Sequence, residues 1–192
     1  MDTPRTGRPR DERVDAAILA ATRDVLVETG YARLTMDAVA ARAGAGKAAI
    51  YRRYATKQEL VYAATVHDLD LQTPPDTGSL TTDLKALIDD ILATMGSPTA
   101  LGSVPGLMAD VSADPALTAR FQQTFVARQQ ECITAVLDRA VHRGELQDKP
   151  DLDVVHALLA GPVFVWLFIL RKGERDSFAH DLATRLASAV TK

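Results

Sequence analysis

Apolar residues recur along the chain at spacings of three and four positions, and no stretch of the sequence alternates steadily between apolar and polar residues. Spacings of three and four place side chains on one face of an α-helix. The pattern therefore predicts an all-α protein of about nine helices. The first apolar stripe runs from Val14 to Val25, and Gly30 is expected to end that helix, because glycine is common just after helix C-termini.

Turn signals separate the later helices. A helix that begins near Lys57 must end before Pro74 and Pro75, because proline cannot continue a helix. Asp114 followed by Pro115 predicts the start of a long helix, since an aspartate cap and a proline in the first turn are a common pair. Beyond the prolines the expected helices cover about residues 80–95, 100–110, 115–143 and 151–172, and a last helix reaches Val190.

The helix from residue 151 is too apolar for a surface element, because no face carries charge between Ala157 and Leu170. We expect a second copy of the chain to cover one side, with Gly161 allowing close approach and Pro162 kinking the helix. The alternative is a central core helix of a monomer.

The apolar run from Ala157 to Leu170 is shorter than the ~20 residues that cross a bilayer, so we expect no membrane segment and a cytoplasmic protein. The single cysteine, Cys132, is expected to be a buried apolar residue.

Charge is distributed unevenly along the chain. The net charge is −3, but residues 1–57 carry +4 and residues 58–192 carry −7. An acidic protein with a basic first third predicts an anion-binding module confined to that third. We therefore expect a flexible basic arm at residues 1–10, a helix-turn-helix domain at residues 11–56 and a helical ligand-binding and dimerisation domain at residues 57–192.

The segment from Lys47 to Tyr54 carries the candidate chemistry. On a helical wheel Ile50 and Tyr54 face inward, while Ala48, Ala49, Tyr51 and Arg52 lie on the other sides. Small side chains let a helix enter the DNA major groove, and arginine can bond two acceptors of guanine. Thr35, Tyr51 and Lys57 could hold phosphates, and the turn Gly44-Ala45-Gly46 joins two short helices as in a helix-turn-helix. A solvated cationic face of a small bundle is the alternative.

Residues 35–57, "TMDAVAARAGAGKAAIYRRYATK", together with "ETGYARLT" at 28–35, resemble the DNA-binding signature of the tetracycline-repressor (TetR) family. The resemblance implies a homodimer with an N-terminal three-helix DNA-binding domain, a ligand site in the C-terminal domain and dimer contacts through the last two helices. Most such proteins repress transcription and leave a palindromic operator when a ligand binds; an activator or a corepressor-dependent regulator is the alternative. The resemblance also implies DNA contacts for eight residues: Thr35, Lys47, Ala48, Ala49, Tyr51, Arg52, Arg53 and Lys57. Gly46 departs from the pattern, which has serine or threonine there.

Two weaker sets of residues complete the prediction. Arg8 and Arg10, with Arg5, could enter a narrow minor groove as an extended arm, or belong to a tail with incidental charge. The side chains expected to line a cavity for an apolar or aromatic effector are His67, Met95, Met108, Phe121, Phe125 and Trp166. The sequence shows no catalytic set, converging metal ligands or cofactor motif, so we expect no enzyme, metal or cofactor; an enzyme or small-molecule carrier is the competing class.

Overall fold

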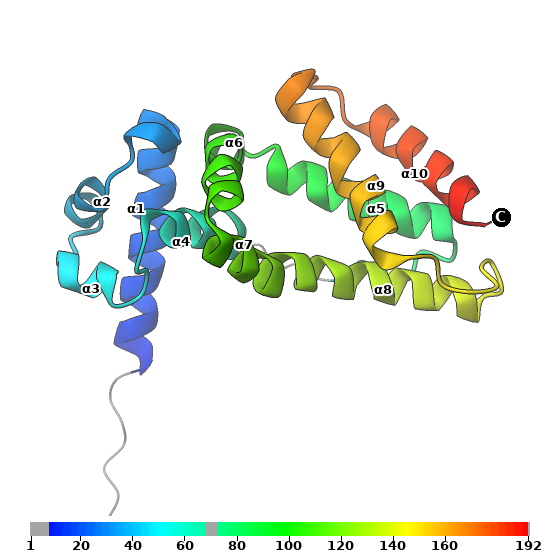
Figure 1. Ribbon diagram of the computed structural model, residues 1–192, viewed down its shortest axis with the longest axis horizontal. Coiled ribbons are helices and arrows are strands. Elements are labelled where there is room, and N and C mark those ends of the chain that lie inside the picture. Colours follow the sequence, from blue (N-terminus) through cyan, green and yellow to red (C-terminus); the bar gives the residue numbers. More distant parts are fainter. Residues whose placement is uncertain (1–7, 68–72, 192) are drawn as a thin grey trace, which may run out of the picture. The chain divides into compact units, whose positions relative to one another are not determined.

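The structure is a computed structural model that describes residues 8–67 and 73–191, with side chains described from residue 13 onwards except at residues 66 and 67 (Figure 1). This part of the chain contains helices and no strand, which confirms the all-α prediction. The helices form two compact units. The first comprises Met1–Leu69 and Pro98–Ala113, and the second comprises Asp70–Ser97 and Asp114–Lys192.

The first unit begins with the three helices that the sequence predicts (Figure 1). Its helices are α1 (Arg8–Arg33), α2 (Met36–Ala43), α3 (Lys47–Tyr51), α4 (Lys57–Tyr62), the π-helical turn η1 (Ala63–His67) and α6 (Pro98–Ala113). The predicted end at Gly30 is a break inside α1, where Gly30 has φ +74 and ψ 168 before the chain turns helical again. Only glycine adopts this backbone conformation without strain.

Apolar burial holds the first unit together. Its fully buried side chains come from α1, α2, α3, α4 and α6 and from the linker before α2, and they include Ile18, Leu26, Leu34, Val39, Ile50, Leu60 and Leu107. Helix α6 packs on α1 so closely that a Cβ at Gly106 would lie 2.4 Å from the ring of Tyr31. Residues 98–113 and helix α4 therefore belong to the same unit as the first helices, whereas we expected residues 57–192 to form a second domain.

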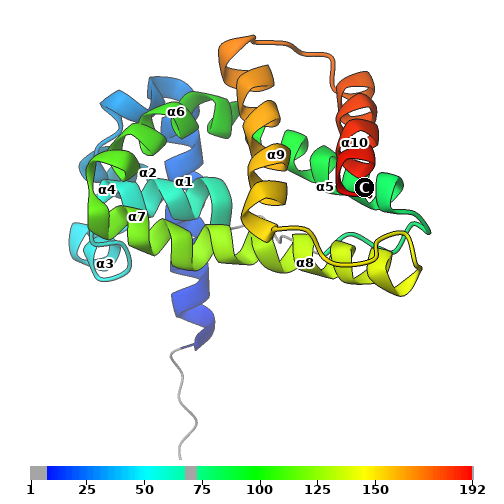
Figure 2. The same cartoon turned by 45° about the vertical axis from the view of Figure 1, so that its right-hand side comes forward.

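The second unit consists of α5 (Leu80–Met95), α7 (Pro115–Phe121), η2 (Gln122–Val126), α8 (Ala127–His142), α9 (Leu152–Phe164), η3 (Val165–Ile169) and α10 (Asp176–Val190) (Figure 2). The π-turns η2 and η3 join their neighbours into two long helical stretches, 115–142 and 152–169, close to the predicted ones. Asp114 caps α7 as predicted, accepting hydrogen bonds from the amides of Ala116 and Leu117. Pro162 lies inside α9, and η3 begins three residues later.

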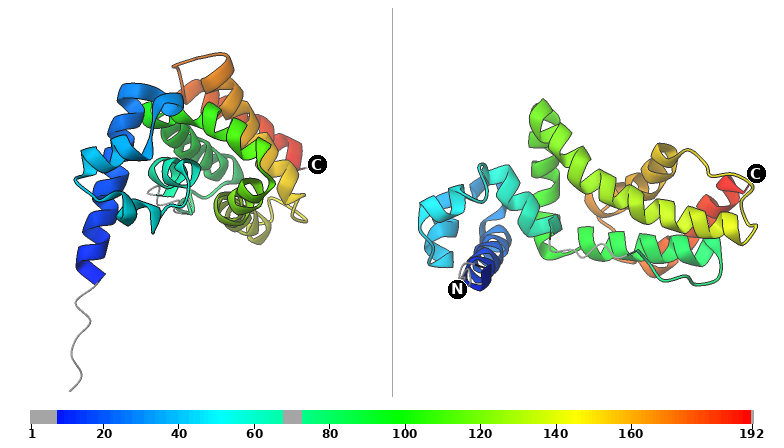
Figure 3. Two further views of the ribbon diagram at one scale, coloured as in Figure 1. Left: turned by 60° about the vertical axis from the view of Figure 1, so that its left-hand side comes forward. Right: turned by 90° about the horizontal axis from the view of Figure 1, so that it is seen from below.

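Helix α5 is the centre of the second unit, since α8, α9 and α10 all pack against it (Figure 3). Leu84 and Ile88 of α5, Val136 of α8 and Leu159 of α9 are fully buried in the core. Cys132 lies in the same core with 6% of its surface exposed, as expected.

A buried carboxylate ties α5 to the end of α8. The side chain of Asp83 is 0% exposed and receives a 3.0 Å hydrogen bond from Arg143 and a 2.8 Å bond from the amide of Thr77. Burial alone would raise the pKa of Asp83, but the hydrogen bonds from Thr77 and Arg143 outweigh it, so the pKa lies below its usual value. Asp83 also lies 3.6 Å from Arg139, so this one buried carboxylate faces two arginines near the end of α8.

Candidate DNA-binding site

The turn between α2 and α3 is fixed by backbone hydrogen bonds. Gly44 adopts φ +60, the amide of Ala45 donates to the carbonyl of Ala40 over 3.1 Å, and the amide of Gly44 donates to that of Ala41 over 3.4 Å. These two bonds form a Schellman motif, which needs a left-handed residue at the position of Gly44. At the other end of α2, the hydroxyl of Thr35 accepts a 3.2 Å bond from the amide of Ala38. Its own O–H proton stays able to donate to a phosphate.

Helix α3 is held to the unit by one fully buried side chain, Ile50. The helix covers Lys47–Tyr51 and ends three residues earlier than predicted. Gly46 is its N-cap and makes no side-chain capping bond, as its lack of a side chain requires. A five-residue helix has too few hydrogen bonds to be stable alone, so the turn and Ile50 must set its position.

The outward face of α3 matches the predicted composition. Ala48 and Arg52 are exposed, and Tyr51 exposes 51% of its surface. Arg52 forms no ion pair with any side chain in the described ranges, so its guanidinium can fork onto a base. Ala49 is half-buried, and Thr35 is exposed at the start of α2.

Lys47 is exposed but already paired. Its ammonium lies 2.6 Å from a carboxylate oxygen of Asp37, the second residue of α2. Both side chains face solvent, and such a pair contributes little to stability. Lys47 could therefore exchange the carboxylate for a phosphate at small cost.

Arg53 faces the protein rather than the predicted DNA side. Its guanidinium donates 3.0 Å to the carbonyl of Ala49 and lies 3.6 Å from the carboxylate of Asp15 on α1. Tyr54 donates a 2.8 Å hydrogen bond to the same carboxylate. Arg53 and Tyr54, which follow α3, are thus joined to α1 through Asp15, and both side chains help to position α3.

Lys57, the first residue of α4, is half-buried and lies over an aromatic ring. Its ammonium is 4.2 Å from the ring centroid of Tyr31, a cation–π distance. Tyr31 in turn donates a short hydrogen bond to Asp110 of α6, which also accepts a 2.7 Å bond from Gln58. Hydrogen bonds from Tyr31 and Gln58 lower the pKa of Asp110. Any phosphate contact by Lys57 is thus made from a side chain that also belongs to the contact between α1, α4 and α6.

Sequence reasoning missed the ion pair that fastens α2 to α1. Arg42 donates two hydrogen bonds to Glu28, 2.9 Å and 2.6 Å long, and they lower the pKa of that carboxyl. The partners lie fourteen positions apart on different helices. Helical periodicity predicts pairs only three or four positions apart, so no local signal could have found it.

Comparison with known proteins identifies the family. Residues 18–64 match the family described as "Bacterial regulatory proteins, tetR family", and residues 74–186 match "Tetracyclin repressor-like, C-terminal domain". The chain belongs to the TetR family of bacterial transcriptional regulators. This TetR-family regulator is 38% identical over 161 residues to an uncharacterised HTH-type transcriptional regulator, Mb1581, of Mycobacterium bovis, covering 83% of this chain and 78% of the relative. It is 36% identical to the DNA-binding transcriptional repressor TetR of Mycobacteroides abscessus, covering 77% and 78%.

Solved structures agree with this assignment. The TetR family transcription regulator SCO0332 superposes with a TM-score of 0.73 at 27% identity, covering 92% of this chain and 98% of the other. The transcriptional regulator FadR from Bacillus subtilis in complex with stearoyl-CoA has the same fold, with a TM-score of 0.63 at 14% identity and coverage of 91% and 98%. Regulators of this family bind DNA and small-molecule effectors and are not enzymes, which confirms the expected class.

The predicted arm of this TetR-family regulator lies mostly outside the described residues. Arg5 is in residues 1–7, and helix α1 already begins at Arg8, so residues 8–10 have helical backbone. The side chains of Arg8 and Arg10 are not described, and neither is the side chain of His67 in η1.

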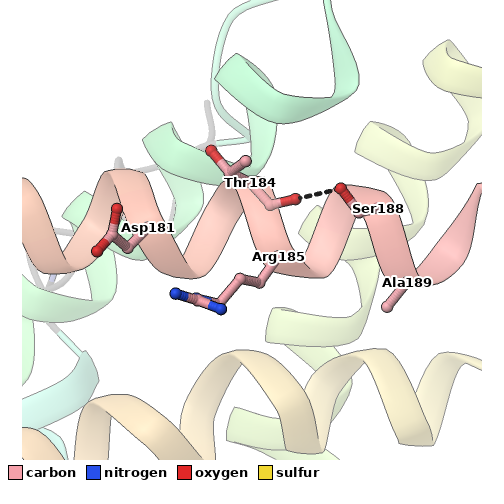
Figure 4. A pocket seen from close by; sticks show the side chains of 5 residues that line it. All are labelled: Asp181, Thr184, Arg185, Ser188 and Ala189. Carbon is pink, nitrogen blue, oxygen red and sulfur yellow. Dashed lines mark hydrogen bonds between the residues drawn. The ribbon is translucent and has the colours of Figure 1, made fainter.

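The other predicted ligand-lining residues divide between the two units. Met108 lies on α6 in the first unit, and Met95, Phe121, Phe125 and Trp166 lie in the second. Phe121 and Phe125 are half-buried with ring centroids 5.0 Å apart. Trp166 stacks on Phe178 at 4.3 Å and donates to the carbonyl of Glu174, so it braces the loop before α10. A shallow depression on α10 involves none of them; it is lined by Asp181, Thr184, Arg185, Ser188 and Ala189 (Figure 4).

Proposed function

We propose that the protein is a cytoplasmic homodimeric repressor that binds a palindromic operator and is released from it by a small apolar or aromatic ligand. The observation that carries the DNA-binding part is the outward face of α3, where Ala48, Tyr51 and Arg52 are exposed on a helix anchored by Ile50. A named repressor among the relatives supports the repressing role.

A palindromic operator follows from the size of the reading element. One helix with a single forking arginine can recognise only a few base pairs. Two copies related by a two-fold axis would place their α3 helices in successive major grooves, about 34–36 Å apart. The operator should then contain two inverted half-sites about 10 base pairs apart between their centres.

Within each half-site the exposed side chains divide into two roles. Arg52 reads a guanine through its N7 and O6 atoms, and the methyl groups of Ala48 and Ala49 meet thymine methyls. Thr35, Tyr51 and Lys47 bind phosphates and set the register, as Lys57 does from α4. Arg53 positions the segment through Asp15, because its guanidinium is already engaged with the protein.

Selection of bound fragments from random DNA tests this function. We expect an inverted repeat with a guanine in each half-site. Fluorescence anisotropy on the recovered duplex and on a scrambled duplex should then show that Arg52→Ala loses about 1–3 kcal/mol of discrimination between them. Arg128→Ala removes an exposed arginine from α8 and is the matched control, expected to bind as the unchanged protein does. Failure to recover any enriched site at low salt would refute the proposal.

Two observations support release by a ligand: a structural relative that binds a small molecule, and an aromatic pair in the second unit. A structural relative holds stearoyl-CoA, a ligand with a long apolar chain. Phe121, the last residue of α7, and Phe125, within η2, form a half-buried aromatic pair. Helical turns of the π type are frequent at functional sites. Of the side chains predicted to line a cavity, we propose Phe121 and Phe125 as the ones that contact an apolar effector.

Thermal-shift screening followed by anisotropy tests the effector. Acyl-CoA esters and apolar aromatic compounds should raise the melting temperature and reduce binding to the recovered operator. Phe125→Ala should abolish both effects without changing DNA binding in the absence of the compound. A compound that stabilises the protein and strengthens DNA binding would instead indicate a corepressor, and the release mechanism would be wrong.

A further inference from the structure

Lys57 lies where three helices of the first unit meet. Its ammonium is 4.2 Å from the centre of the ring of Tyr31, which follows the break in α1 at Gly30. Tyr31 is only 9% exposed, and its ring lies against Gly106 of α6, where an added Cβ would overlap it. Packing therefore fixes the ring, and with it the place at which the cation of Lys57 rests.

The hydroxyl of this tyrosine holds a carboxylate. Tyr31 donates a short hydrogen bond to Oδ2 of Asp110, and Nε2 of Gln58 donates a 2.7 Å bond to the same oxygen. The bond from Tyr31, followed by the bond from Gln58, lowers the pKa of Asp110, so the carboxylate is charged at neutral pH. Burial and the bond to Asp110 raise the pKa of Tyr31, so the phenol keeps its proton and remains the donor.

The other oxygen of Asp110 accepts no hydrogen bond from the described residues, since both bonds reach Oδ2. The ammonium of Lys57 is close enough to lower the pKa of Asp110, yet these two side chains form no ion pair. Two neutral donors thus hold a half-buried carboxylate beside a cation without letting the charges meet.

A phosphate bound by Lys57 would share the ammonium with this carboxylate. Both groups are anions, and the attraction of each for the ammonium falls only as the inverse of distance. Lys57 and Asp110 are both half-buried, so water and salt screen them less than they screen an exposed pair. The negative charge of Asp110 therefore opposes the approach of a phosphate.

We propose that Asp110 competes with a DNA phosphate for the ammonium of Lys57. Tyr31 and Gln58 limit the competition, because they hold the carboxylate at Oδ2. The inference rests on the proposed function, in which Lys57 binds a phosphate, and it adds a residue of α6 that lowers the affinity. Phosphate contacts carry no sequence information, so Asp110 lowers the affinity for all duplexes alike and leaves discrimination to α3.

A purely structural role of these side chains predicts a different pattern. If Asp110 only joined α1, α4 and α6, loss of its charge and loss of the tyrosine hydroxyl would loosen the same contact, and both would weaken DNA binding. Competition predicts opposite signs. Asp110→Asn keeps an oxygen that accepts both hydrogen bonds but has no charge. Tyr31→Phe keeps the ring beside Lys57 and frees the carboxylate to pair with the ammonium.

Fluorescence anisotropy with a labelled duplex of mixed sequence tests the competition. Asp110→Asn should raise the affinity about fivefold, the effect of one unit charge near an ammonium in water, and Tyr31→Phe should lower it. The double variant should bind as tightly as Asp110→Asn, because Tyr31 acts only through the carboxylate. Asp24→Asn removes an exposed carboxylate from α1 and is the control of equal net charge, expected to change the affinity less than about twofold.

The salt dependence of the affinity provides a second measurement. Asp110→Asn should steepen the plot of log affinity against log salt by up to about one phosphate contact, and Tyr31→Phe should make it shallower. If Tyr31→Phe does not fold, Gln58→Leu removes the other donor and should lower the affinity in the same direction. Lower affinity of Asp110→Asn, with a melting temperature like that of the unchanged protein, would show a structural contact and overturn the inference.

Two further results separate this inference from the proposed function. An unchanged protein that binds no duplex at low salt would lack the proposed function, and the inference would fall with it. A protein that selects an inverted repeat, but gains no affinity in Asp110→Asn, would keep the function and lose the competition. In a Lys57→Met background Asp110→Asn should no longer raise the affinity; a full gain there would show that Asp110 acts without Lys57 and would also refute the inference.

Discussion

The outward face of α3 and an exposed apolar face of α9 and η3 are built in the same way with opposite chemistry. We call the second surface, formed by Val154, Leu158, Val165 and Ile169, the α9 stripe. In each, one side of the helix is buried and fixes its position, while the other side is left to a partner. Helix α3 presents small side chains and an arginine, and α9 with η3 presents large apolar side chains. The first surface is suited to a polyanion, whose binding weakens with salt, and the second to burial from water, which salt does not screen.

The two surfaces also differ in how firmly their own chain holds them. Helix α3 has five residues and one buried side chain, whereas α9 and η3 together bury four side chains in a core shared with α5 and α8. The DNA-binding face should therefore be sensitive to single changes near the turn. A substitution elsewhere in the second unit should disturb the stripe only when it destabilises that unit.

The largest expected effect comes from the buried ion pair of the second unit. Arg143 keeps Asp76 and Glu145 as partners in Asp83→Asn, but the buried Nε of Arg139, 3.6 Å from Asp83, loses its carboxylate. The variant should therefore lower the free energy of unfolding by about 3–5 kcal/mol at neutral pH. The dimer should weaken with it, because the stripe is built on this unit. Chemical denaturation followed by tryptophan fluorescence measures the effect, since Trp166 packs against the same core. A loss below about 1 kcal/mol would contradict a structural role for the pair.

The same variant has a defined pH dependence. The pKa of Asp83 is lower in the folded protein than its usual value, so its contribution is present above the unfolded pKa of about 4 and is lost as the pH falls through the folded pKa. The stability difference between the two proteins should be constant from pH 5 to 8 and should shrink below about pH 4. A difference that grows on acidification would show that another group is responsible.

The next largest effect concerns the anchor of α3. Ile50→Ala removes the side chain that docks the helix and should cost about 2–5 kcal/mol of stability within the first unit. Binding to the operator should be lost while dimer formation is unchanged, because the stripe lies in the other unit. Anisotropy and sedimentation on one preparation compare the two. Loss of both activities together would mean that the surfaces are not independently supported.

A smaller effect is expected from freeing Lys47. Asp37→Asn removes the carboxylate 2.6 Å from its ammonium, so Lys47 no longer has to leave a partner to reach a phosphate. Affinity for DNA should rise severalfold on both the recovered and the scrambled duplex, since phosphate contacts are independent of sequence. Dimerisation, which involves other side chains, should not change. A rise restricted to the recovered site would assign Lys47 to base reading instead.

The sequence predicted helices far better than it predicted partners of polar side chains. The helix-turn-helix, the cap at Asp114 and the burial of Ile50 follow from local periodicity and turn chemistry, and all are confirmed. The inward position of Arg53 depends on Asp15, thirty-eight residues away on α1, and the place of α6 depends on Gly106 fitting under Tyr31. Such contacts form only when helices distant in the sequence pack together, so composition and local spacing cannot predict them.

The smallest expected effect is at the N-cap of α3, and it sharpens the contrast between the two surfaces. Gly46→Ser adds a hydroxyl that can accept a bond from an amide of the first turn, where Gly46 makes no side-chain bond. Relative to glycine this should add only a few tenths of a kcal/mol to stability. The same hydroxyl can donate to a phosphate, so affinity for all duplexes should rise, whereas Gly46→Ala should give neither gain. Because Gly46 has φ −68, alanine is not strained there and serves as the matched control. Equal affinities for the serine and alanine variants would show that the cap of α3 lies away from the DNA backbone, leaving Thr35 and Tyr51 to set the register.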